Sequence, residues 1–119
     1  MKVLVADDEP FVRSTLSMLL KLEGHDVALA SDGRAALDGA LANPPDVILS
    51  DMHMPRLSGR ELLHAVRGDI RLAQTRFVFL TGEAQAPADA ATGNVQADGL
   101  LTKPFSREQL LALLKSLGS

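Results

Sequence analysis

Several residue types that support common protein functions are scarce or missing in this sequence of 119 residues. It has no cysteine, tryptophan or tyrosine, and only four phenylalanines. The absence of cysteine excludes structural disulfides, thiolate metal sites and thiol nucleophiles. So few aromatic rings argue against a platform on which bases or sugars stack. No apolar run approaches the roughly 20 residues that a membrane-spanning helix needs, so we expect no membrane partner.

The charge balance and the length narrow the function classes further. The sequence has 12 Lys and Arg residues and 15 Asp and Glu residues, which gives a net charge of −3. Because phosphate contacts need a basic face, we expect no direct binding of nucleic acid. The length predicts a single domain over residues 1–119. A strand-like run begins at Met1 and leaves no room for a signal peptide, which, with the lack of cysteine, favours a cytoplasmic protein.

Short apolar runs recur along the chain at fairly even distances. Each run has four or five residues, mostly Val, Ile, Leu, Ala or Phe, without strict alternation of apolar and polar residues. Continuous apolarity of this kind is typical of strands that are covered on both faces. The predicted strands are residues 2–6, 26–30, 46–50, 77–81 and 99–102.

The stretches between these runs have the spacing and the end signals of helices. Gly24 is a favourable residue just after a helix end, and Asp32 is a favourable N-cap. Ser106 and Gln109 have the spacing of a capping box, in which each residue's side chain accepts a hydrogen bond from the other's backbone N–H. The predicted helices are residues 11–22, 34–42, 59–66, 83–96 and 107–117. The stretch 83–96 is the weakest, because it contains a proline, a glycine and few large apolar residues.

Strands that alternate with helices in this way predict an α/β fold. The expected architecture is a doubly wound parallel sheet of five strands with five helices on its two faces. In such sheets the functional residues lie beyond the carboxyl ends of the strands, near the point where the strand order reverses.

Five polar residues lie at the ends of the predicted strands or just after them, at positions 7, 8, 51, 81 and 103. Three of them are aspartates, one is a threonine and one is a lysine. Three carboxylates that lie close together repel one another, and an all-oxygen cluster suits Mg²⁺. One aspartate could act as a nucleophile, while the hydroxyl and the ammonium stabilise charge on a phosphoryl group. Each residue alone is commonplace in this position, but together they indicate an aspartyl-phosphate site.

These residues belong to a longer series of short motifs along the chain. In order, they are the acidic pair Asp7-Asp8, the D-x-x-M-P segment 51–55, Gly59, Thr81 and the pair Lys103-Pro104. In this combination the sequence resembles, over essentially its full length, the receiver domain of two-component response regulators. The resemblance implies a flavodoxin-like fold with strand order 2-1-3-4-5.

The resemblance also implies the role of each acidic residue. Asp51 is expected to be the phosphoacceptor. Asp8, Asp51 and the backbone carbonyl of His53 are expected to bind Mg²⁺ directly, and Asp7 to act on the ion mainly through water.

Thr81 and Lys103 are expected to contact oxygens of the phosphoryl group once Asp51 is modified. Pro104 matches a lysine-proline step of the family that is often a cis bond. One position departs from the family: Leu100 stands where most receivers carry a Tyr or Phe that changes rotamer with the threonine. The aromatic reporter of activation is therefore absent from this chain.

The implied function is a signalling switch and not an enzyme in the usual sense. The chain would receive a phosphoryl group from a histidine kinase or a phosphotransfer protein, hydrolyse it slowly, and change its partner-binding surface. The sequence does not identify the kinase, the downstream output domain or protein, or whether the chain forms a dimer.

Three other functions fit the fold less well. A receiver-like interaction module that is not phosphorylated usually lacks an acidic-pair residue, the acceptor or the lysine, and this chain has all of them. A phosphatase of the haloacid dehalogenase type needs a second aspartate two residues after the nucleophile, where this chain has His53, and a cap that the length excludes. A flavodoxin needs a phosphate loop rich in Ser and Thr, and aromatic rings to stack on flavin.

Overall fold

The computed structural model describes residues 1–81, 91–92, 95–103 and 105–118. Within these residues, five parallel strands form one sheet in the order β2-β1-β3-β4-β7. This order confirms the expected flavodoxin-like topology. The strands are β1 (Lys2–Ala6), β2 (Asp26–Ala30), β3 (Val47–Asp51), β4 (Arg76–Thr81) and β7 (Gly99–Thr102).

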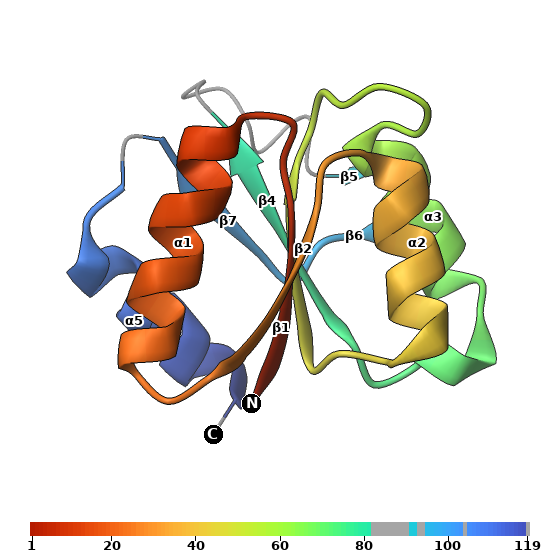
Figure 1. Cartoon of the computed structure of the whole chain (residues 1–119). Coiled ribbons are helices and arrows are strands. Elements are labelled where there is room, and N and C mark those ends of the chain that lie inside the picture. The colour runs from red at the N-terminus through yellow and green to blue at the C-terminus, as the bar shows by residue number, and fades with distance from the viewer. Residues whose placement is uncertain (82–90, 93–94, 104, 119) are drawn as a thin grey trace.

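Helices cover both faces of the sheet, with α1 and α5 on one side and α2 and α3 on the other (Figure 1). Val5 of the sheet packs with Leu16 and Leu110 under α1 and α5. Ile48 packs with Leu62 in the second cluster, under α2 and α3. The helices are α1 (Pro10–Leu22), α2 (Gly33–Ala42), α3 (Gly59–Arg67) and α5 (Arg107–Gly118), with a short 3-10 helix, η1 (Ile70–Leu72), after α3. Within the described ranges, no helix is long and apolar enough to cross a membrane.

The helix ends form as the sequence predicts. Gly24 has a positive φ of 84° just after α1, where its amide donates to the Lys21 carbonyl and the next amide donates to the Leu20 carbonyl. The Asp32 side chain accepts a hydrogen bond from the third residue of α2 at 2.8 Å. Ser106 and Gln109 form the expected reciprocal capping box.

The predicted helix over residues 83–96 is wrong where the structure describes it. Ala91–Thr92 (β5) and Val95–Gln96 (β6) pair as antiparallel strands, and residues 82–90 and 93–94 lie outside the described residues. The described part of the chain therefore contains four α-helices instead of the expected five. The physical reason lies in the residue types, because Thr92 and Val95 are β-branched and favour extended backbone, and Gly93 between them disfavours a helix.

Gly59 positions the first turn of α3 directly against the end of β3. Its amide donates to the Met52 carbonyl at 3.0 Å. A Cβ at this position would overlap the Asp51 carbonyl oxygen and lie 2.9 Å from the Met52 Cα. The glycine is therefore needed for the close approach of two backbone segments, one of which carries Asp51.

We expect Gly59→Ala to lower the free energy of unfolding by about 1–3 kcal/mol, since neither backbone segment can move away cheaply. Gly39→Ala is the matched control, because a Cβ at Gly39 meets nothing within 4 Å. That substitution should raise the free energy of unfolding by up to about 1 kcal/mol through helix propensity. Urea denaturation measures both changes. Equal effects of the two substitutions would contradict the backbone contact at Gly59.

Candidate functional site

The candidate site lies where the strand order reverses, at the carboxyl ends of β1 and β3. Asp7 follows β1 directly, Asp51 ends β3, Thr81 ends β4 and Lys103 follows β7. Strand β1 pairs with β2 on one side and with β3 on the other, so the chain leaves the ends of β1 and β3 in opposite directions. The parallel sheet thereby brings residues from four separate parts of the sequence to one edge.

Lys103 holds the acidic residues of this edge together. Its Nζ lies 2.9 Å from an oxygen of Asp7, 3.8 Å from one of Asp51 and 3.9 Å from one of Glu9. Its backbone amide donates to the Thr81 carbonyl, which fixes the start of the side chain beside β4. One ammonium group therefore faces three carboxylates.

Asp7 is the most tightly held of these carboxylates. The residue is completely buried. One carboxylate oxygen accepts from the Lys103 ammonium, and the other accepts from the Glu9 amide at 2.9 Å. Its own amide donates to the Ala30 carbonyl, and its carbonyl accepts from the Arg13 guanidinium at 2.7 Å. Asp7 is therefore fixed by both its side chain and its backbone.

Asp51 is more accessible and is held from the loop that follows β3. Its side chain is 13% exposed, and its Oδ1 accepts from the Met52 amide at 2.8 Å. Burial, together with the negative charge of Asp7, raises the pKa of the Asp51 carboxyl above its ordinary value, although Lys103 and the amides of Met52 and His53 act in the opposite direction. Burial is thus the main cause of the raised pKa, and the neighbouring Asp7 carboxylate adds to it.

The charge of Lys103 is supported by the same neighbours. Burial alone would lower the pKa of the ammonium, but the hydrogen bond that it donates to Asp7 and the charges of Asp51, Asp7 and Glu9 outweigh burial and raise this pKa. Lys103 therefore stays protonated throughout the neutral range.

Four carboxylates lie close enough together to hold a metal ion. Asp7, Asp8, Glu9 and Asp51 each offer an oxygen atom within 4.8 Å of the others. Hard oxygen ligands of this kind suit Mg²⁺, and a cation among these four carboxylates would reduce their mutual repulsion. Glu9 was not among the predicted site residues, although it directly follows the acidic pair. His53 is exposed in the loop after Asp51, and the role of its carbonyl stays a prediction.

Two more residues singled out in the sequence, Thr81 and Leu100, lie in the neighbouring strands β4 and β7. Thr81 is buried at the end of β4. Leu100 lies in β7 opposite Phe79 of β4 and packs against the hydrophobic cluster under α2 and α3. An aliphatic side chain therefore stands where most receivers have an aromatic one. Pro104, with its expected cis bond, lies outside the described residues.

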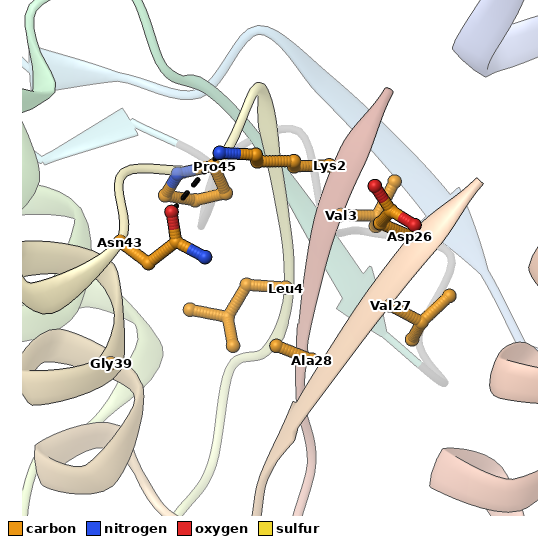
Figure 2. A pocket seen from close by; sticks show the side chains of 9 residues that line it. All are labelled: Lys2, Val3, Leu4, Asp26, Val27, Ala28, Gly39, Asn43 and Pro45. Carbon is orange, nitrogen blue, oxygen red and sulfur yellow. Dashed lines mark hydrogen bonds between the residues drawn. The ribbon is translucent and has the colours of Figure 1, made fainter.

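A separate hollow of about 210 Å³ opens at the opposite edge of the sheet, between α2 and the starts of β1 and β2 (Figure 2). Lys2 and Asn43 are hydrogen-bonded across part of it, at 3.1 Å. Because the amino ends of the strands form this edge, the hollow lies away from Asp7, Asp8 and Asp51. It brings together none of the predicted site residues.

Comparison with known proteins agrees with this geometry. The family model "Response regulator receiver domain" matches residues 3–115, which includes all the strand-end residues described above. The chain belongs to the response regulator receiver domain family.

Relatives and solved structures show how far the likeness extends. The chain is 37% identical over 118 residues to the response regulator MprA of Mycolicibacterium vanbaalenii, which covers 98% of this chain but only 49% of that protein. The chain thus spans about half the length of the curated relatives it matches. The structure of the chemotaxis response regulator CheY4 of Vibrio cholerae is 38% identical with a TM-score of 0.90, and covers 98% of this chain and 97% of that one.

A third similar structure includes a metal ion. It is the receiver domain of the sensor histidine kinase PA1611 of Pseudomonas aeruginosa, described with a magnesium ion coordinated in the active site cleft. It is 26% identical to this chain with a TM-score of 0.87, and the match covers 99% of this chain and 98% of that one.

The ion pair between Lys103 and Asp7 yields a prediction about stability. Without Mg²⁺, we expect Lys103→Met to lower the free energy of unfolding by about 3 kcal/mol, because it leaves the buried Asp7 carboxylate without a cation. Adding Asp7→Asn should recover part of this loss, so the two effects should not add. Urea denaturation of the single and double variants measures this coupling.

Lys21→Met is the control for this prediction, because Lys21 lies exposed in the last turn of α1. A surface change of this kind should alter the free energy of unfolding by less than about 0.5 kcal/mol. Equal losses for Lys103→Met and Lys21→Met would show that the Asp7 ion pair contributes nothing.

Proposed function

We propose that this receiver domain is a phosphoryl-accepting switch in which Asp51 takes a phosphoryl group from a phosphohistidine of a histidine kinase or a phosphotransfer protein. The observation that carries the proposal is the placement of Asp51. Its carboxylate is partly exposed, 3.8 Å from the Lys103 ammonium, and shares an edge of the sheet with a cluster of three further carboxylates.

The chain's own residues account for most of the chemistry. An oxygen of Asp51 attacks the phosphorus, the P–O bond forms as the P–N bond breaks, and the electron pair of that bond returns to the imidazole. Lys103 is close enough to Asp51 to pair with an oxygen of the transferred group. Thr81, which ends the neighbouring strand, would donate its hydroxyl to another oxygen.

Mg²⁺ is the cofactor that these residues fit. Asp8, Asp51 and the His53 carbonyl would hold it directly, with Asp7 acting through water and Glu9 at the rim of the cluster. When bound, the ion supplies positive charge that offsets the carboxylates and the phosphoryl oxygens. The magnesium ion described in the PA1611 receiver domain supports this assignment.

The downstream consequence of phosphorylation is also part of the proposal. The chain spans about half of its curated relatives, so an output domain or a separate protein would read the changed surface. We propose a cytoplasmic location for this exchange. A non-phosphorylated interaction module is the alternative, and it is disfavoured because the acceptor, the acidic pair and the lysine are all present and lie together.

Phosphorylation of Asp51 can be tested directly by mass spectrometry of the intact protein. Incubation with acetyl phosphate and Mg²⁺ should add the mass of one phosphoryl group. Asp51→Asn should abolish the addition, and a chelator should prevent it. Asp38→Asn is the matched control, because Asp38 is exposed on α2 away from the site and should leave the addition unchanged. Wild-type protein that binds Mg²⁺ but is never modified would refute the proposal.

Mg²⁺ should also stabilise the folded protein, because it binds the assembled carboxylates and not the unfolded chain. At ten times its dissociation constant, the ion should raise the free energy of unfolding by about 1.4 kcal/mol. Asp8→Ala should remove this gain while leaving the metal-free protein equally or more stable, since one repelling carboxylate is gone. Asp38→Ala should keep the gain. If thermal melts show the same Mg²⁺ effect in Asp8→Ala and wild type, the ion binds elsewhere.

A further inference from the structure

Helix α1 is apolar on the side that faces away from the core. Leu16 and Leu20 point into the sheet and are fully buried. At 3.6 residues per turn, Phe11, Met18 and Leu22 fall on the opposite side of the helix. Their exposed fractions are 80%, 57% and 70%. A surface helix normally carries polar residues on this side. Packing into the core therefore does not explain why these three positions are apolar.

The edge strand β2 also exposes a large apolar side chain on the face of the sheet that carries α1. Leu29 of β2 is 49% exposed. Val27 packs into the cluster under α1 and α5, and alternate residues of a strand share a face, so Leu29 lies on the α1 side of the sheet. We call Phe11, Met18 and Leu22 the α1 patch. Several exposed large apolar side chains on one side of a helix mark an interaction site more often than a solvated surface.

The spacing along α1 shows what shape of partner the patch fits. Residues 11, 15, 18 and 22 follow one another at steps of four, three and four, which is the spacing of a helix–helix seam. These steps read the same in both directions. If two α1 helices lie antiparallel about a two-fold axis, Phe11 therefore faces Leu22 of the second copy, and Thr15 faces its Met18.

The charges at the two ends of α1 favour the antiparallel orientation. Asp8 and Glu9 are exposed just before the first turn, and Lys21 is exposed in the last turn. Antiparallel helices bring Lys21 of one copy to within about one turn of the acidic residues of the other, and their dipoles oppose each other favourably. Parallel helices would place the two acidic ends side by side.

We propose that two copies of this chain form a symmetric dimer through the α1 patch, with their α1 helices antiparallel. The interface is self-complementary, as a two-fold axis requires, because residues 11, 15, 18 and 22 of each copy contribute to both sides. This proposal does not depend on phosphorylation of Asp51, so either proposal can fail without the other.

The first test is sedimentation velocity of the whole chain from low-micromolar to sub-millimolar concentration. Wild-type protein should show a concentration-dependent dimer. Met18→Glu places a charge at the centre of the patch and should weaken the dimer by at least about tenfold. Ile70→Glu is the matched control, because Ile70 is an equally apolar residue, 91% exposed, in η1 and outside the patch. It should leave the dimer unchanged, and thermal melts should show that both variants remain folded.

The second test determines the orientation. The chain has no cysteine, so Phe11→Cys and Leu22→Cys each introduce a single reactive group. A short bis-maleimide should cross-link a mixture of the two variants and neither variant alone, because equal positions lie about 16 Å apart along antiparallel helices.

Three results would overturn the proposal. They are a wild-type chain that is monomeric at every concentration, a dimer that Met18→Glu does not weaken, and cross-links that form equally well within each single variant. A monomeric chain whose phosphorylation by a kinase is slowed by Met18→Glu would assign the α1 patch to a phosphodonor protein instead.

Discussion

The ion pair between Lys103 and Asp7 is the contact on which the functional edge of the sheet depends. Asp7 is completely buried, and its carboxylate lies 2.9 Å from the Lys103 ammonium. A buried carboxylate needs such a partner, because leaving it unpaired costs several kcal/mol. The pair joins the ends of β1 and β7, and β3 and β4 lie between these strands in the sheet. Asp51 and Thr81 end the two enclosed strands, so the same contact lies on either side of both residues.

Besides this ion pair, the site has more negative than positive charge. One ammonium faces three carboxylates, and a fourth carboxylate, that of Asp8, lies in the same cluster. A site of this kind is less favourable for the folded protein when empty than when it holds a cation. A cation bound among these carboxylates would therefore also stabilise the fold.

Much of the fold could be predicted from the sequence because its signals are local. The apolar runs, the Gly24 helix end, the Asp32 N-cap and the capping box from Ser106 to Gln109 each depend on residues a few positions apart. The prediction failed in the described residues near position 92, where helix-forming alanines suggested a helix and β-branched residues pair as strands instead. A second capping box, between Ser58 and Glu61 at the start of α3, was missed although its spacing is present in the sequence.

The sequence by itself determined which residue types follow each strand, and hence that carboxylates, a hydroxyl and an ammonium meet at one edge of a parallel sheet. Only the tertiary structure decided that Lys103 pairs most closely with Asp7, 96 residues away, and that Glu9 joins the acidic cluster. These contacts depend on how segments far apart in the sequence pack together, and a local sequence pattern does not contain that information.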